Sequence, residues 1–235
     1  MQRNRKGKQK IWGMIMGAVV LVIVAFLVGN LTASRDNLAS LPKPEAETEG
    51  QRGELGIDKN INESTIDNYL GRDDAVYRDL RMLVDPADYE AIGGDAFLSG
   101  FVDGFEVAPF PYLVNVTSLP ETVGGTYDGT TLFLYDGKNY TPLYEESMEV
   151  LEALFPKDKV IFLMCGGGGY ANAMKNMLVA LGWDESKIYN VGGYWYYDGE
   201  NNIEVMRKKD DGDVMYDFYK VPYHSIDFGT LEKKQ

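Results

Sequence analysis

The amino-acid sequence predicts an α/β fold built on a parallel sheet. Residues 160–164 form an uninterrupted apolar run, which is typical of a strand buried on both faces. The segment that follows a glycine loop then repeats apolar side chains at the spacing of one helix face: Met174, Met177, Leu178 and Leu181. A second strand is expected at 187–191, and Gly192-Gly193 ends it. Strand, helix and strand in so short a span favour a parallel pair joined by a right-handed crossover.

Composition excludes several classes of function. The chain has 235 residues, a net charge of −13, one Cys and one His. An acidic chain lacks the basic face that phosphates need, so we expect no nucleic-acid partner. One Cys cannot form an internal disulfide, and one Cys with one His cannot build a Cys/His zinc site. We therefore predict no metal and no cofactor.

The amino-terminal charge pattern predicts a membrane anchor. Residues 1–10 carry five cations and no acid, and residues 11–29 carry no charge. Nineteen uncharged residues nearly span a bilayer core, so we expect a transmembrane signal anchor. The small residues at 31–34 leave cleavage of a signal peptide open. The basic segment should stay in the cytoplasm, which makes this a single-pass cell-membrane protein with its carboxyl-terminal domain outside the cytoplasm.

Residues 30–65 read as a disordered acidic linker. The stretch 41–50 combines Pro, Gly and acids and has no apolar period. The remaining residues, 66–235, hold 14 cations and 29 acids, a net charge of −15. This length is enough for one sizeable core.

Further elements are expected on both sides of the central block. We predict a strand at 75–81, a helix that starts at Asp85-Pro86 and ends at Gly93-Gly94, and a short or edge strand at 105–116. A hairpin is expected at 131–135 and 139–141, followed by a helix at 145–155 that Pro156 ends. Gly182 should close the helix at 170–181. Residues 201–235 form a carboxyl-terminal extension with a β-hairpin around 210–213.

Cys165 stands where chemistry collects in open α/β sheets. It ends the buried strand, and four glycines and a helix follow it. Glycines let successive backbone N–H groups turn inward, and the helix dipole adds partial positive charge at the same place. Both effects favour the thiolate form of Cys165 and make it a candidate nucleophile.

The order of motifs resembles a single rhodanese-like domain of the sulfurtransferase family. The six-residue loop of that family, often Cys-x-x-Gly-x-Arg, corresponds to residues 165–170, with Cys165 and Gly168 matching and Tyr170 in the Arg position. The family's Asp-x-Arg at the end of the first strand corresponds to Asp79-Leu80-Arg81. Its Gly-His-Ile-x-Gly-Ala motif with a following Pro corresponds to residues 100–105 and Pro109, and its Gly-Gly-x-x-x-Trp to residues 192–197.

This resemblance implies a rhodanese-like parallel sheet flanked by helices over residues 66–200. It implies that Cys165 takes sulfane sulfur from a small donor such as thiosulfate or polysulfide, and passes it from a persulfide to a thiol acceptor. A protein partner is also compatible with it. The persulfide would be held by the N–H groups of the loop and supported by Asp79 and Arg81; the loop residues are Gly166, Gly167, Gly168, Gly169 and Tyr170. A non-catalytic rhodanese-like binding or sensing module is the alternative, because Tyr170 has no positive charge.

Other patterns in the sequence fit less well. Residues 166–171 match a dinucleotide fingerprint, but the next strand ends in Asn190 and Val191 rather than in an acid. A cysteine phosphatase needs an Arg where Ala171 stands. A papain-like pair would need His224 to approach Cys165 from far along the chain.

Overall fold

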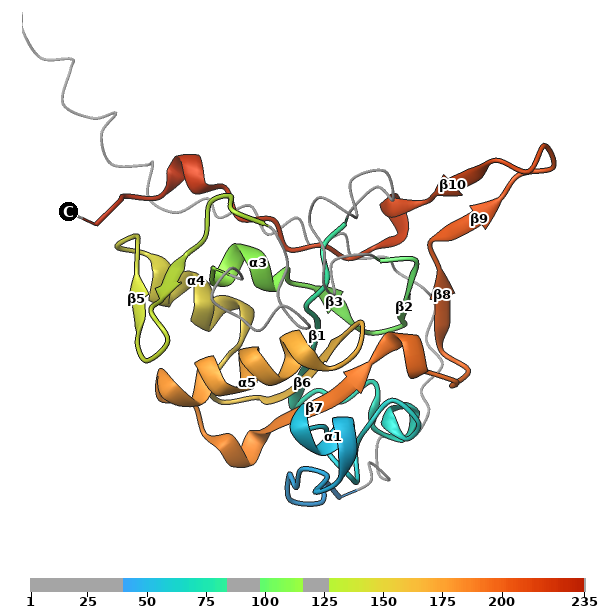
Figure 1. The fold of residues 1–235 in the computed structure, drawn as a ribbon, viewed down its shortest axis with the longest axis horizontal. Coiled ribbons are helices and arrows are strands. Elements are labelled where there is room, and N and C mark those ends of the chain that lie inside the picture. The colour runs from blue at the N-terminus through green and yellow to red at the C-terminus, as the bar shows by residue number, and fades with distance from the viewer. Residues whose placement is uncertain (1–39, 84–97, 116–126, 235) are drawn as a thin grey trace, which may run out of the picture. The chain divides into compact units, whose positions relative to one another are not determined.

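The computed structural model describes residues 40–83, 98–115 and 127–234, and these residues form a mixed α/β fold (Figure 1). Its centre is a four-stranded sheet in the order β3-β1-β6-β7, in which every neighbouring pair is parallel. The strands are β1 (Ala75–Asp79), β3 (Glu106–Val107), β6 (Val160–Cys165) and β7 (Ile188–Gly193). The predicted α/β class with a parallel sheet, and the parallel pairing of β6 with β7, are confirmed.

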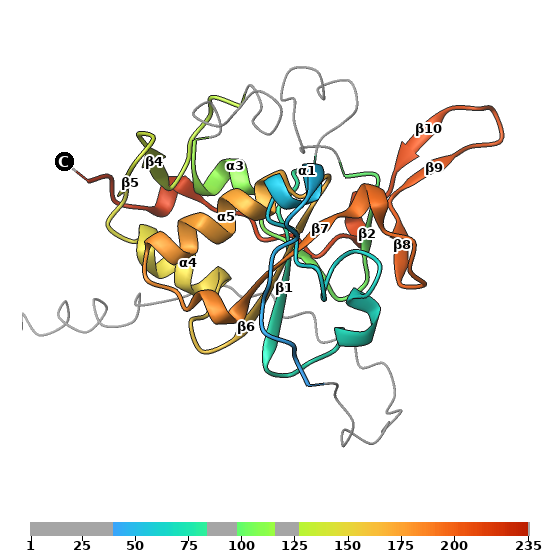
Figure 2. The ribbon, with the colours of Figure 1, turned by 60° about the horizontal axis from the view of Figure 1, so that its bottom comes forward.

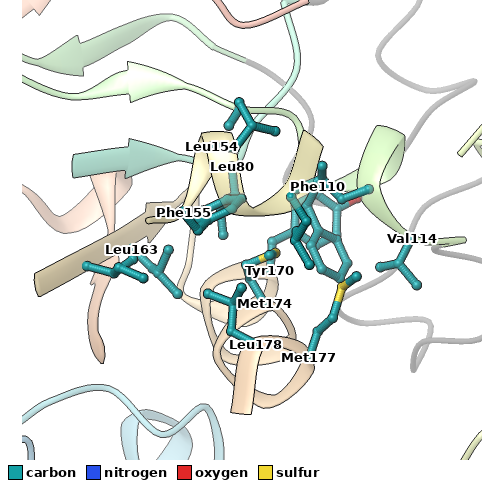
Figure 3. Packing of buried hydrophobic residues seen from close by; sticks show 14 of the residues in the cluster. Leu80, Phe110, Val114, Leu154, Phe155, Leu163, Tyr170, Met174, Met177 and Leu178 are labelled. Carbon is teal, nitrogen blue, oxygen red and sulfur yellow. The ribbon is translucent and has the colours of Figure 1, made fainter. Parts of the chain in front are cut away.

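The sheet is covered on both faces, which explains the uninterrupted apolar run in β6. Ile161, Leu163 and Cys165 belong to one core cluster, together with buried residues of the helices α4 (Ser147–Leu154) and α5 (Gly169–Ala180). Phe162 and Met164 belong to a second cluster that contains neither helix. Alternate residues of a strand face opposite sides, so β6 contributes to both cores. Figure 3 shows part of the first cluster, whose labelled members include Phe110, Leu163 and Met174.

Both predicted helices around β6 form where the sequence places them. On α4, the buried Leu151 faces the same core as Phe155 just beyond the helix end. On α5, Met174, Met177 and Leu178 are fully buried, as the helical spacing requires. Gly182 follows α5 with φ +96°, so it closes the helix as predicted.

The segment predicted as a disordered linker is folded from residue 40 onward. It contains α1 (Gly50–Glu54), and Ile57 and Ile61 behind it are buried, Ile61 in the same core cluster as Phe162 of β6. Asp58 caps its own turn by accepting hydrogen bonds from the N–H groups of Asn60 and Ile61. The Pro- and acid-rich composition therefore misleads, because sparse Ile side chains are enough to attach the segment to the sheet. The prediction for residues 30–39 lies outside the described residues.

The smaller elements agree with the sequence in part. The predicted hairpin forms from β4 (Phe133–Tyr135) and β5 (Tyr140–Pro142). The strand expected at 105–116 is wrong beyond Val107, because Pro109 starts the short helix α3 (Phe110–Leu113). Short 3₁₀ turns lie at Ile66–Tyr69, Glu185–Lys187, Tyr194–Tyr196, Phe218–Lys220 and Phe228–Thr230.

The carboxyl-terminal extension packs back onto the domain and carries the predicted hairpin. Strand β8 (Asn202–Glu204) pairs with β2 (Gly100–Val102), so the extension completes a second small sheet. The hairpin of β9 (Met206–Lys208) and β10 (Val214–Tyr216) turns at the expected residues 210–213 and extends away from the sheet (Figure 1).

Two further sequence predictions fall outside the described residues. One is the anchor at 11–29, and the other is the helix from Asp85-Pro86 to Gly93-Gly94. Within the part of the chain that the structure describes, no helix combines the length and apolar content needed to cross a bilayer.

A partly exposed ion cluster attaches the carboxyl-terminal extension to the edge strand β3. Glu106 accepts a hydrogen bond from Arg78 at 2.7 Å and lies 2.8 Å from Nε2 of His224. The bond to His224 lowers the pKa of Glu106, against the effect of burial, and Arg78 lowers it further. A carboxyl with a lowered pKa stabilises the fold at neutral pH, and that contribution disappears as pH falls through the carboxyl range, about pH 4.

We therefore expect Glu106→Gln to lower the free energy of unfolding at pH 7 and to change it little near pH 3. Urea unfolding of both proteins at the two pH values measures this. An equal loss at both pH values would contradict the role of the carboxylate charge.

Candidate functional site

Cys165 ends the strand β6, with a neighbouring strand on each side. Its Cα partner on β7 is Gly193, and on the other side Met164 is opposite Asp79, the last residue of β1. The carboxyl ends of three parallel strands therefore meet around the thiol. The side chain of Cys165 is fully buried, with 0% of its surface exposed.

The glycine loop directs a backbone donor at the sulfur. The loop leads straight into α5, whose first residue is Gly169, and the N–H of Gly168 donates a hydrogen bond to Sγ of Cys165 at 3.1 Å. Gly168 has φ +103°, a left-handed conformation that a side chain would strain. The sulfur thus lies at the amino end of a twelve-residue helix, where the helix dipole favours negative charge.

A close backbone contact fixes the loop against the end of β7. A Cβ atom on Gly193 would lie 2.1 Å from the carbonyl oxygen of Gly166 and 2.6 Å from Cα of Gly167. The same carbonyl accepts a hydrogen bond from the N–H of Trp195 at 3.1 Å. The packing of the loop against β7 therefore requires a glycine at position 193, the second glycine of the Gly192-Gly193 motif.

Asp79 and Arg81 form a fully buried ion pair beside the loop. Both side chains are 0% exposed, and Nε of Arg81 donates to Oδ1 of Asp79 at 2.9 Å. Burial by itself disfavours the charged guanidinium, but the Asp79 carboxylate raises the pKa of Arg81 above its usual value. Cys165 raises this pKa further, because it lies close enough to interact with the charge.

The Arg81 side chain contacts the residue that follows β7. Its guanidinium carbon lies 4.3 Å from the ring centre of Tyr194, the residue that follows β7. Because β6 lies between β1 and β7, this contact joins residues that follow the two strands flanking Cys165. Nη2 of Arg81 also donates to the carbonyl oxygen of Gly100 at 2.8 Å. Among the described residues, Nη1 has no hydrogen-bond partner although it is buried.

Tyr170 does not point into the loop. Its ring is fully buried in the core cluster and lies 5.1 Å from the ring of Phe110, near Met174 and Met177 (Figure 3). The side chain that takes the Arg position of the family motif therefore serves packing. The prediction that the backbone N–H of Tyr170 helps to hold an anion stays a prediction.

Residues 55–63, here called the strap, cover the loop from the side of α1 (Figure 2). The buried amide of Asn190 donates to the carbonyl oxygen of Leu55 at 2.8 Å and to that of Gly168 at 3.2 Å, so one side chain joins strap and loop. Ile57 approaches to 3.0 Å of the Cβ position of Gly168. Sequence reasoning missed the strap and Asn190, because the strap reads as linker and Asn190 carries no chemical signature.

The other candidate residues do not assemble at Cys165. His224 is bound to Glu106 on the edge strand β3, and β1 separates β3 from β6, so no papain-like pair forms. Lys159 lies before the opposite end of β6 and donates to the carbonyl oxygen of Asp73. No group of three metal-ligating side chains occurs within the described ranges.

Comparison of the chain with protein-family models, with curated proteins and with solved structures found no match in any of the three.

Proposed function

We propose that this protein is a membrane-tethered, extracytoplasmic sulfurtransferase of the rhodanese-like type, which carries sulfane sulfur as a persulfide on Cys165. The observation that carries the proposal is the hydrogen bond from the Gly168 N–H to Cys165 Sγ at the amino end of α5. A thiolate and a persulfide anion are both stabilised by such donors. The resemblance of the motifs around residues 79–81, 100–109, 165–170 and 192–197 supports the same chemistry.

The reaction has two balanced steps. The Cys165 thiolate attacks the outer sulfur of a donor R–S–SH, forms a new S–S bond and releases RS⁻, which gives Cys165–S–SH. The persulfide loses its proton to solvent, and a thiolate acceptor then attacks the outer sulfur and returns the Cys165 thiolate. The loop N–H groups bind the charge that develops on sulfur in both steps.

A non-catalytic binding or sensing module is the second candidate. The complete burial of Cys165 favours it, because a donor must reach the sulfur before any transfer. On this alternative, the loop and the strap form a rigid part of a docking domain. Cys165 is then an unreactive thiol that only fills space in the core.

Mass spectrometry of the full chain in detergent separates the two candidates. After incubation with an organic hydropersulfide, we expect a gain of one sulfur atom on the peptide that contains Cys165. Cys165→Ser should gain none, and its thermal unfolding should match that of the native protein. A native protein that stays unmodified, while alkylation after unfolding shows an intact thiol, would support the binding module instead.

A further inference from the structure

Resting on the proposed persulfide chemistry, we infer that the site takes sulfur from a donor with at most one negative charge, such as a hydropersulfide, in preference to the thiosulfate dianion. The inference follows from the charges around Cys165 and from the one buried donor group that they leave unused.

The charged groups beside Cys165 neutralise one another. Arg81, the cation whose charge interacts with Cys165, is buried with Asp79 in a pair whose bonds include Nη2 to Oδ2 at 2.5 Å. A buried pair of this kind has no net charge to offer a ligand. A dianion brought to Cys165 would therefore meet dipoles and N–H groups but no uncompensated cation from this pair.

The strap adds a second pair whose acid is the deeper partner. Glu63 is 3% exposed, whereas its partner Arg52 is 41% exposed. The Cβ position of Gly192 lies 2.4 Å from Oε2 of Glu63, so the carboxylate sits directly against the glycine pair that fixes the loop. Solvent screens the exposed Arg52 more than the buried Glu63, so the field of this pair at the loop opposes anions.

No other cation is available close to the loop along the chain. The sequence contains no Lys or Arg between Arg81 and Lys138, nor between Lys159 and Lys175. Lys159 lies beyond the opposite end of β6, and Lys175 lies 3.9 Å from Glu185. The segments 84–97 and 116–126 contain no Lys or Arg. Among the described cations discussed above, none is left without a partner for the second charge of thiosulfate.

One buried donor group remains for a single anionic sulfur. Nη1 of Arg81 carries two N–H donors and has no hydrogen-bond partner among the described residues. An unsatisfied buried donor is costly, so a sulfur anion that accepts its hydrogen bonds would be favoured. Attack of Cys165–S⁻ on R–S–SH releases RS⁻ and forms Cys165–S–SH. Once this persulfide loses its proton to solvent, its outer sulfur carries one negative charge. One donor group, Nη1 of Arg81, is thus available for one anionic sulfur.

Single-turnover persulfide formation tests the inference on the full chain in detergent. Cysteine hydropersulfide and thiosulfate are supplied at equal concentration, and the modified fraction of the Cys165 peptide is followed by mass spectrometry. We expect the hydropersulfide to react at least about tenfold faster than thiosulfate. We also expect added salt to accelerate the thiosulfate reaction more than the hydropersulfide reaction, because salt screens the repulsion of the dianion. Equal rates or faster thiosulfate would overturn the inference and leave the proposed function intact. No adduct with either donor would refute the proposed function itself.

Glu63→Gln provides a matched variant, because it removes the buried charge and keeps the shape of the side chain and its hydrogen bond to Arg52. We expect Glu63→Gln to lower the ratio of the hydropersulfide rate to the thiosulfate rate by about threefold. Glu149→Gln removes an exposed charge from α4 and should leave the ratio unchanged. An unchanged ratio in a folded Glu63→Gln protein would contradict the electrostatic origin of the preference.

Discussion

Gly193→Ala is expected to destabilise the fold by about 3 kcal/mol and to abolish persulfide formation on Cys165. The added Cβ would lie 2.1 Å from the carbonyl oxygen of Gly166 and 2.6 Å from Cα of Gly167. Both atoms belong to the backbone, so no side-chain rotation relieves the contact. The loop must separate from β7, and the N–H of Gly168 then loses its position beside the sulfur.

Urea unfolding and mass spectrometry after hydropersulfide treatment measure the two effects. Gly104→Ala is the control, because Gly104 has φ +89° and open space around its Cβ position. That variant should lose only about 1 kcal/mol through backbone strain and should form the persulfide normally. A Gly193→Ala protein with native stability and a normal persulfide yield would show that the loop does not depend on this contact.

The sequence was sufficient for elements whose local pattern and burial agree. The run in β6 and the helical spacing on α5 predict those elements and their parallel continuation in β7, because each is buried in the way that its pattern implies. Patterns that depend on distant contacts were less informative. The strap looks polar, and only the structure shows that Ile57 and Ile61 hold it against the sheet.

Only the part of the candidate site that is contiguous in sequence could be predicted. Cys165 and its glycines are adjacent in sequence, so their loop could be proposed directly. The contact between Arg81 and Tyr194 joins residues more than a hundred positions apart, and it depends on the strand order β1-β6-β7. A motif match also places Tyr170 in a functional position, whereas its side chain is committed to the core beside Phe110.

Removing the charge of Asp79 is expected to have the largest effect on stability. Asp79→Asn leaves the guanidinium of Arg81 buried without an anion, and breaking such a pair costs about 3–5 kcal/mol. Arg81→Met should cost a similar amount, because it leaves the Asp79 carboxylate buried and unpaired. Urea unfolding of each variant at neutral pH measures the change in the free energy of unfolding.

The double variant Asp79→Asn, Arg81→Met separates the cost of an unpaired charge from the contribution of the pair itself. Because neither charge remains buried in it, we expect the double variant to be more stable than either single variant, with a coupling of about 2 kcal/mol or more. Losses that simply add would mean that the two side chains stabilise the fold independently. The folded double variant also tests the site. Because it lacks the guanidinium, it should form the Cys165 persulfide more slowly than the native chain. An undiminished rate would show that Arg81 has no role in persulfide formation.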